Sequence, residues 1–184
     1  MTYEIDIAGL KRELPLCKLN DNLAIGAFVM FGDVEVTVHC ARELLAKAPE
    51  YDYLVSPEAK AIPLVYEMAR QSGANDYIIA RKHAKAYMPD PLEVDVQSIT
   101  TADKQHLILA HEDAEAIKGK RVAIVDDVIS TGESMAAVEA LINKAGGTVV
   151  ARMAPLAEGD AAKRDDIIFL AKLPLFNADG TPKD

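Results

Sequence analysis

The fold is decided by one segment of the chain, Val122-Ala123-Ile124-Val125-Asp126-Asp127-Val128-Ile129-Ser130-Thr131-Gly132-Glu133-Ser134. Its first four residues are all apolar, which predicts a strand that is buried on both faces, as in a parallel sheet. Two acidic residues follow at the carboxyl end of this strand, and a turn with hydroxyls and a glycine then opens a helix. Ligands of open α/β sheets bind at this edge, so the segment predicts both a fold and the place of its site.

Strand and helix patterns alternate along the rest of the chain. Apolar runs predict strands at residues 53–55, 77–80, 121–125, 148–151 and 167–171. Apolar residues spaced at i, i+3, i+4 and i+7 predict two helices, which end at Ser72-Gly73 and at Gly146-Gly147. This alternation predicts the α/β class, with an open, mostly parallel sheet flanked by helices.

A long excursion interrupts the alternation between residues 81 and 115. It begins with basic residues and then shows two β-like segments, residues 94–100 and 106–110. We expect a β-hairpin flap over about residues 81–110 that closes on the site, because lids are drawn from such long excursions. The alternative is an ordinary surface hairpin.

The two ends of the chain contribute less to the alternation of strands and helices. We expect about residues 1–35 and 170–184 to form a small cap packed on the sheet, with residues 177–184 as a polar tail. The length of 184 residues predicts a single domain that spans residues 1–184.

The composition is that of a globular protein, with 50% hydrophobic and 27% charged residues. No apolar run is long enough to span a membrane, and the amino end lacks the pattern of a signal peptide. The two cysteines, Cys17 and Cys40, fit free thiols in a reducing cytoplasm. A formal net charge of −9 disfavours nucleic-acid binding, so an anionic ligand needs a local positive site.

The residue types of the deciding segment suit a phosphorylated sugar. The start of a helix offers unpaired N–H groups and the positive end of its dipole to a phosphate, and Gly132 lets the backbone approach closely. The two acids accept hydrogen bonds from sugar hydroxyls or orient a hydrated Mg²⁺. Two alternatives are a capping box from Ser130 to Glu133, which needs no ligand, and the Walker B strand of a nucleotidase, for which the chain lacks the G-x-x-x-x-G-K-[ST] loop.

Several segments resemble one family of enzymes. The run from Val122 to Ser134 resembles the ribose-5-phosphate signature of type I phosphoribosyltransferases, which use phosphoribosyl pyrophosphate (PRPP). Residues 56–63 resemble the pyrophosphate loop of that family. Residues 80–85 resemble the basic segment that opens the flap in its purine branch, which contains the adenine and xanthine enzymes, and residues 96–100 resemble the returning strand of that flap. The resemblance covers about residues 20–175.

The resemblance implies a role for each part of the predicted site. The ribose and 5-phosphate of PRPP are expected to bind Asp126, Asp127, Val128, Ile129, Ser130, Thr131, Gly132, Glu133 and Ser134. Its pyrophosphate is expected to bind Glu58, Ala59, Lys60, Ala61, Arg81, Lys82 and Lys85. The base is expected to contact Leu23, Phe28, Met30, Phe31 and Glu158. For the apolar members of this last group, the alternative is a place in the core.

The catalytic groups that the resemblance implies are Asp127 and Asp103. Adenine relatives carry a glutamate in the flap, where this chain has Ser98-Ile99-Thr100-Thr101-Ala102-Asp103, so Asp103 is the candidate substitute. The cofactor implied is Mg²⁺, which is expected to arrive with PRPP and to have Asp126 as a candidate ligand.

The function that the resemblance implies is purine salvage in the cytoplasm, in which adenine and PRPP give AMP and pyrophosphate. Adenine is favoured over xanthine because Glu158-Gly159 stands where xanthine relatives carry a lysine, and a carboxylate accepts from an exocyclic amine. A homodimer is also implied, with no nucleic-acid or membrane partner. Two alternatives stay open: a xanthine or hypoxanthine/guanine enzyme, and a PRPP-sensing regulator without turnover.

Overall fold

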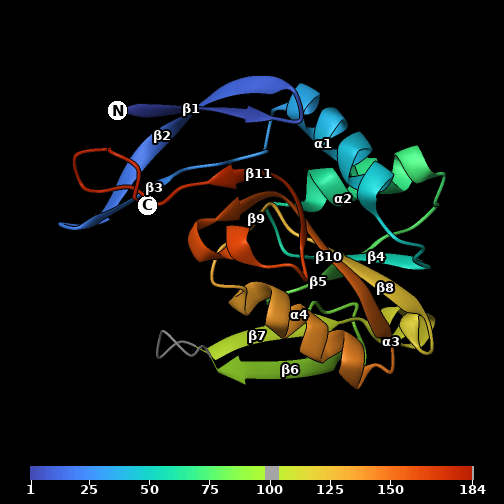
Figure 1. The fold of residues 1–184 in the computed structure, drawn as a ribbon. Helices are drawn as coiled ribbons and strands as arrows, with labels where there is room; N and C mark the ends of the chain where they lie inside the picture. Colours follow the sequence, from blue (N-terminus) through green and yellow to red (C-terminus); the bar gives the residue numbers. More distant parts are fainter. Residues whose placement is uncertain (98–103, 184) are drawn as a thin grey trace.

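A parallel sheet of six strands forms the centre of the computed structural model, which describes residues 1–97 and 104–183 (Figure 1). The strands lie in the order β11-β10-β8-β4-β5, with the short β9 beside β10. They are β4 (Tyr53–Pro57), β5 (Ile78–Ala80), β8 (Arg121–Val125), β9 (Val128–Ile129), β10 (Thr148–Glu158) and β11 (Ile168–Leu173). All pairs of neighbours are parallel, which confirms the predicted α/β class.

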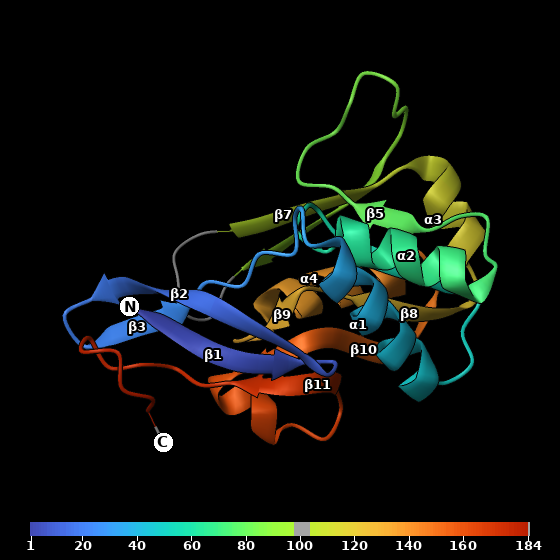
Figure 2. The same ribbon diagram turned by 90° about the horizontal axis from the view of Figure 1, so that it is seen from above.

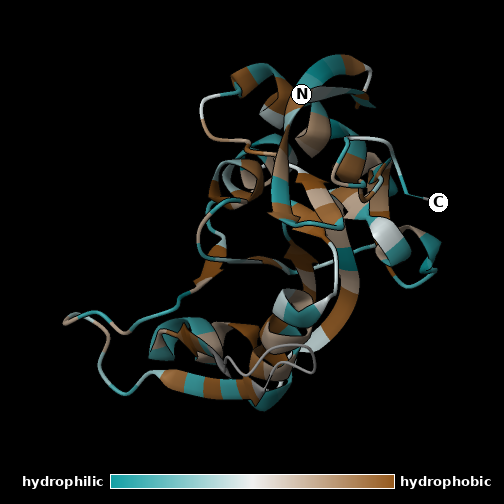
Figure 3. Ribbon diagram, turned by 90° about the vertical axis from the view of Figure 1, so that its left-hand side faces the viewer, coloured by the Kyte–Doolittle hydropathy of each residue, from teal (hydrophilic) through white to brown (hydrophobic). Residues whose placement is uncertain are grey.

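Strand β8 has an apolar core on each of its faces. Val122 and Ile124 belong to one buried cluster, whereas Ala123 and Val125 belong to the other. Successive side chains of a strand point to opposite faces, so a strand between two cores needs an uninterrupted apolar run. Figure 3 shows the corresponding concentration of strongly hydrophobic residues in the central strands.

Helices cover the two faces of the sheet (Figure 1). α1 (Val34–Lys47) and α2 (Ile62–Ser72) pack together on one face, and α4 (Glu133–Lys144) lies on the other. The short α3 (His111–Ile117) precedes β8. As predicted, α2 ends at a glycine, Gly73, whose φ of 77° is the left-handed conformation of a helix cap. None of the helices in the described part of the chain is long and apolar enough to cross a membrane.

The excursion contains the predicted hairpin. β6 (Leu92–Gln97) and β7 (Lys104–Leu109) form an antiparallel pair that packs against α4, with the side chain of Leu109 fully buried. Lys144 Nζ, at the end of α4, donates to the carbonyl oxygen of Glu93 at 2.7 Å. The connection from β5 to β6 stands away from the body of the protein (Figure 2). Closure of this region over a ligand stays a prediction.

A second, antiparallel sheet lies at one end of the molecule. Its strands are β1 (Thr2–Ile7), β2 (Leu10–Asn20) and β3 (Leu23–Gly26). The carboxyl end of the chain joins this sheet, because the backbone of Phe176 pairs with Ala24. The ring of Phe176 meets Tyr3 edge to face, with 5.0 Å between the ring centroids. The two ends of the chain are therefore fastened to each other here.

The last residues do not form a free polar tail. The Asn177 N–H donates to the carbonyl oxygen of Thr181 at 2.8 Å, and the Lys183 N–H donates to that of Leu175 at 2.7 Å. The segment therefore turns back along the chain, because its backbone groups pair with one another. The expected cap boundary at residue 170 falls inside β11, within the central sheet.

We expect Phe176→Ala to lower the free energy of unfolding by about 3–5 kcal/mol, because the fully buried ring anchors the carboxyl end of the chain. Phe31→Ala is the matched control, since the ring of Phe31 is 53% exposed. Urea unfolding followed by circular dichroism measures both variants. Equal midpoints for the two variants would contradict the anchoring role of Phe176.

Candidate active site

Two buried acids follow the end of β8. Asp126 is 9% exposed and Asp127 is 4% exposed. The Asp126 N–H donates to the carbonyl oxygen of Met153 in β10 at 2.9 Å, so the pairing of the two strands continues through this acid. The Asp127 N–H donates to Asp126 Oδ1 at 2.8 Å. The strand therefore positions the first carboxyl group, and the backbone of the second acid orients it.

The carboxylate of Asp127 is incompletely satisfied. Lys60 Nζ lies 3.3 Å from Asp127 Oδ2 and forms an ion pair with it. That contact lacks the geometry of a hydrogen bond, so within residues 1–97 and 104–183 this buried oxygen has no hydrogen-bond partner. A buried acceptor without a donor costs free energy. The site is therefore suited to a ligand that brings a donor, such as a hydroxyl group.

Burial changes the acid–base behaviour of Asp126. Removal from water raises the pKa of Asp126 to about 7, and the neighbouring charge of Asp127 acts in the same direction. Carboxyl groups with such perturbed pKa values are concentrated at functional sites. The pair is thus a candidate functional centre on electrostatic grounds as well as by its place at the sheet edge.

The turn after the two acids forms a concave surface at a helix N-terminus. β9 is held by its pairing with β10, and α4 begins at Glu133 with Gly132 as its N-cap. The φ of Gly132 is 81°, a left-handed conformation that favours glycine. A hollow of about 150 Å³ lies at this turn, lined by Asp126 and residues 128–135. Its size and the N–H groups of the first helical turn suit a phosphate.

The capping-box alternative for this turn is wrong. It requires Ser130 as the N-cap of the helix and Glu133 as the third helical residue. The helix instead begins at Glu133, and its N-cap is Gly132, which has no side chain. Thr131 Oγ1 accepts the Glu133 N–H at 3.4 Å, a contact within the turn itself.

The loop between β4 and α2 faces the acids from the neighbouring strand. The Glu58–Ala59 peptide bond in this loop is cis. The Glu58 carboxylate accepts the Lys82 N–H at 3.2 Å and lies 3.8 Å from Arg81 Nη1. The loop after β4 and the segment after β5 are therefore joined, so that the basic residues of the second segment lie beside the first.

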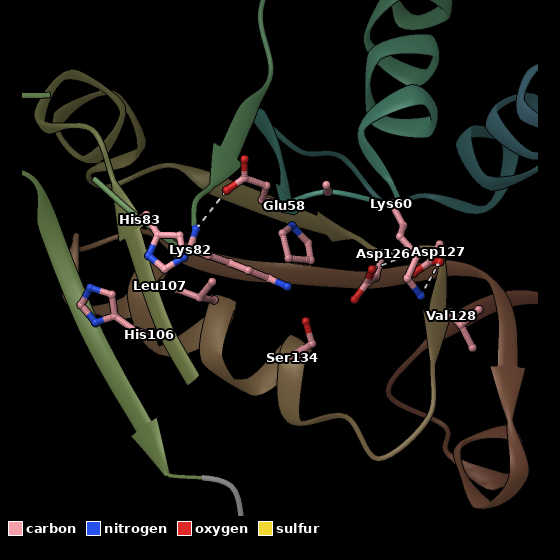
Figure 4. Close-up of a pocket in the computed structure, with 12 residues that line it drawn as sticks. Glu58, Lys60, Lys82, His83, His106, Leu107, Asp126, Asp127, Val128 and Ser134 are labelled. Carbon is pink, nitrogen blue, oxygen red and sulfur yellow. Dashed lines mark hydrogen bonds and ion pairs between the residues drawn. The ribbon is translucent and has the colours of Figure 1, made fainter. Parts of the chain in front are cut away.

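These elements surround one cavity of about 640 Å³ (Figure 4). The cavity is lined by Pro57, Glu58, Ala59, Lys60, Lys82, His83, His106, Leu107, Asp126, Asp127, Val128 and Ser134. In Figure 4, Asp126 and Asp127 lie near Lys60 at one end, and the imidazoles of His83 and His106 lie at the other. The structure thus brings together residues predicted separately for ribose, 5-phosphate and pyrophosphate.

Other residues that the sequence analysis assigned to PRPP lie outside this cavity. Residues 129–133 line the smaller hollow at the helix start. Ala61 is the buried N-cap of α2. Arg81 pairs with Glu58 and does not line the cavity, and Lys85 is exposed on the connection that follows β5.

The residues expected to contact the base do not line the cavity either. Phe28 and Met30 are buried in the core, which was the alternative for them, and Phe31 is exposed. Leu23 in β3 and Glu158 at the end of β10 are half-buried. Asp103, the candidate for the flap acid, lies outside the described residues.

Four residues that line the cavity were not among the expected site residues: Pro57, His83, and His106 and Leu107 of β7. His106 Nδ1 lies 2.7 Å from the Oδ1 atom of Asp95, its cross-strand neighbour in the hairpin. The β-like segment at residues 106–110 predicted this strand, but only the docking of the hairpin beside β5 brings its residues to the site. No signal in the sequence identifies that docking.

The acid pair fits a metal ion only if other ligands come with it. In the described ranges, there is no group of three or more His, Cys, Asp or Glu side chains that could hold a metal ion. Mg²⁺ prefers carboxylate, phosphate and water oxygens, and Asp126 and Asp127 supply carboxylate oxygens at the cavity. They fit a Mg²⁺ ion whose remaining ligands are substrate phosphates and water.

Comparison with known proteins finds several adenine phosphoribosyltransferases among the sequence relatives of this chain. An adenine phosphoribosyltransferase of Thermotoga petrophila is 37% identical over 101 residues, which make up 55% of this chain and 56% of that protein. The chain therefore spans little more than half the length of this relative. An adenine phosphoribosyltransferase of Thermosipho africanus is 30% identical over 156 residues, which make up 75% of this chain and 82% of that protein.

The fold matches more completely than the sequence. The crystal structure of an adenine phosphoribosyltransferase from Thermoanaerobacter pseudethanolicus has a TM-score of 0.65, with 94% of this chain and 95% of that chain covered at 23% identity. The model of the family described as "Phosphoribosyl transferase domain" matches residues 37–176. On the strength of this match, which runs from α1 to Phe176, the chain belongs to the phosphoribosyl transferase domain family and resembles its adenine enzymes.

Proposed function

We propose that this protein transfers the phosphoribosyl group of PRPP to adenine, giving AMP and pyrophosphate. The observation that carries the proposal is the convergence of buried acids and basic loops on one cavity, with the phosphate turn in a second hollow that shares Asp126, Val128 and Ser134 with it. Its 640 Å³ suits a ligand of the size of PRPP, which needs an anion site at each end and hydroxyl acceptors between them. The names of the sequence relatives support adenine as the base.

PRPP is proposed to lie along the cavity with its 5-phosphate at the start of α4 and its pyrophosphate beside the basic loops. Its 5-phosphate occupies the hollow at the start of α4, where helix N–H groups point at an anion. Its ribose hydroxyls donate to Asp126 and Asp127, and the second acid has an unpaired oxygen ready to accept. Its pyrophosphate lies beside the cationic side chains of Lys60 and Lys82.

In the proposed reaction, a ring nitrogen of adenine attacks the anomeric carbon of PRPP. The new C–N bond forms as the bond from that carbon to the pyrophosphate oxygen breaks, so both electrons of the broken bond leave with pyrophosphate. The base loses its N–H proton, and Asp103 stays a candidate acceptor. Positive charge develops on the ribose ring, and the carboxylate of Asp127 is proposed to stabilise it.

Mg²⁺ is the proposed cofactor, and Asp126 is the candidate protein ligand. When bound, it neutralises negative charge on the pyrophosphate group as that group leaves. The ammonium groups of Lys60 and Lys82 act in the same direction from the protein. Closure of the flap, residues 81–110, is proposed to exclude water, because PRPP would otherwise be hydrolysed.

The base, the assembly and the location of the protein are proposals with less support. The exposed ring of Phe31 is the remaining aromatic candidate for the base, since Phe28 is in the core. Glu158 would accept from the amine of adenine, and Leu23 stays an apolar candidate, whereas Met30, like Phe28, is in the core. A homodimer in the cytoplasm is proposed from the resemblance to purine enzymes alone.

Replacement of Asp127 by asparagine is expected to weaken PRPP binding more than tenfold. The variant loses a charged acceptor, and a charge-assisted hydrogen bond contributes about 1.5–3 kcal/mol. Calorimetric titration with PRPP and Mg²⁺ measures the change, and Asp52→Asn is the control. Asp52 pairs with Arg121 at the opposite, amino end of β8. Unchanged PRPP affinity in both Asp127→Asn and Asp126→Asn would overturn the ribose assignment.

The raised pKa of Asp126 links the stability of the free protein to pH. An unfolded aspartate has a pKa of about 3.9, whereas the pKa of Asp126 in the fold is about 7. Between these values the folded state holds a proton that the unfolded state has released. The contribution of Asp126 to stability is therefore greatest at low pH and is lost as pH rises through about 7.

Asp126→Asn is expected to remove this loss. Relative to the wild type, its melting temperature should rise between pH 5 and pH 8 by roughly 5–10 °C, because the two units from pH 5 to a pKa of about 7 correspond to about 2.7 kcal/mol, at about 2–4 °C per kcal/mol for a domain of this size. Asp52→Asn is again the control, because Arg121 lowers the pKa of Asp52 to about 2 and the acid is ionised at both pH values. A difference between Asp126→Asn and wild type that is the same at both pH values would contradict a neutral Asp126 at pH 5.

Competition kinetics with adenine, hypoxanthine, guanine and xanthine test the base. Adenine is expected to have the highest kcat/KM by about 10²-fold, because a mismatched purine leaves buried donors or acceptors unpaired. A higher value for guanine, hypoxanthine or xanthine would replace adenine and leave the transferase assignment standing. If PRPP binds and no base reacts, the protein is instead a PRPP-sensing regulator.

A further inference from the structure

An arginine far along the sequence lies against the phosphate turn. Arg164 follows the short 3-10 helix η1 (Gly159–Lys163), which comes after β10. Its Nη1 atom is 2.6 Å from the point that a Cβ on Gly132 would occupy. A side chain at position 132 would therefore displace this guanidinium, in addition to the strain of a φ of 81°. Glycine allows the turn and the arginine to meet.

The guanidinium of Arg164 is held in one orientation. Its Nε donates to Asp166 Oδ1 at 2.8 Å, and its Nη2 donates to Asp166 Oδ2 at 2.7 Å. This two-point pairing fixes the plane of the group, because both members are planar forks. Nη1 takes no part in the pair, and it is the nitrogen that lies against Gly132. The arrangement thus presents one charged donor to the turn.

The acidic residues around the turn make a nearby cation necessary for phosphate binding. The turn from Ser130 to Ser134 contains no basic side chain and includes Glu133. Asp126 also lines the hollow, and Lys60, the cation nearest to the acid pair, is engaged with Asp127. Backbone N–H groups and a helix dipole favour an anion, but a phosphate dianion beside carboxylates needs further positive charge.

We infer that Arg164 is a binding residue for the 5-phosphate of PRPP and that Asp166 is the positioning residue that orients it. The inference rests on the proposed function, because it assigns one more residue to the same substrate. It also predicts that different cations bind the two ends of PRPP. Arg164 binds the 5-phosphate, whereas Lys60 and Lys82 bind the pyrophosphate.

The test compares two ligands that share no subsite. Ribose 5-phosphate probes the hollow at α4, and pyrophosphate with Mg²⁺ probes the other end of the cavity. Arg164→Gln is expected to weaken binding of ribose 5-phosphate about tenfold or more and to leave the affinity for pyrophosphate within twofold. Arg164→Lys, which keeps the charge, is expected to restore part of the loss. A purely structural arginine would not separate the two ligands in this way.

The control is Arg152→Gln. Arg152 in β10 pairs with Glu139 of α4 through Nε and Nη2, as Arg164 pairs with Asp166, and it is similarly half-buried. This variant is expected to leave both affinities unchanged. Thermal melting of each variant reports its stability. A general loss of fold is recognised by a lower melting temperature together with a fall in both affinities.

Asp166→Asn provides a second route to the same answer, because it keeps the charge of Arg164 and replaces one of the two carboxylate oxygens that orient it by an NH2 group, which cannot accept. We expect a smaller loss of ribose 5-phosphate affinity, with pyrophosphate unaffected. Equal affinity for ribose 5-phosphate in wild type, Arg164→Gln and Asp166→Asn would overturn the role of Arg164 and leave the proposed function intact. Failure of the wild type to bind ribose 5-phosphate or PRPP would overturn the proposed function, and the role of Arg164 with it.

Discussion

The ligand edge of this protein depends on the burial of two adjacent carboxyl groups at the end of β8. Two carboxylates removed from water repel each other, and each needs either a donor, a cation or a proton. Asp126 obtains a backbone donor and holds a proton near neutral pH, while Asp127 obtains the ammonium of Lys60. One oxygen of Asp127 is still left without a hydrogen bond. A hydroxyl group of a ligand can therefore donate the hydrogen bond that this buried oxygen lacks.

The layers around the sheet explain why the two acids stay buried. β8 is central and has an apolar core on each face, so its backbone cannot shift to expose the acids to water. The parallel arrangement also gathers the loops after β4, β5 and β8 at one edge. The free-energy cost of the buried acids at this edge is therefore offset by packing in the two cores, as is common at functional sites.

Sequence predicted the site better than it predicted its surroundings. The strand, turn and helix around Asp126 could be recognised because their signals are local, in an apolar run, two acids and a glycine. Helix α1 was not expected, since residues 34–38 alternate apolar and polar like a strand and only the Asp33 cap, which accepts the Val36 N–H, marks a helix start. Packing between distant segments decides two other features. It places Phe28 in the core instead of a pocket, and it brings His106 to the cavity.

Helix α4 connects two regions that the chain separates. Its first turn forms the proposed phosphate hollow, and its last turn holds the hairpin through Lys144 and the carbonyl oxygen of Glu93. A ligand that orders the first turn therefore also strengthens the support on which β6 and β7 rest. Occupancy of the hollow should then be transmitted along a rigid element to the base of the hairpin, and slower amide hydrogen exchange in β6 would be its signature. In this arrangement α4 would couple binding at one end of the proposed substrate to the order of the strands beside the other end.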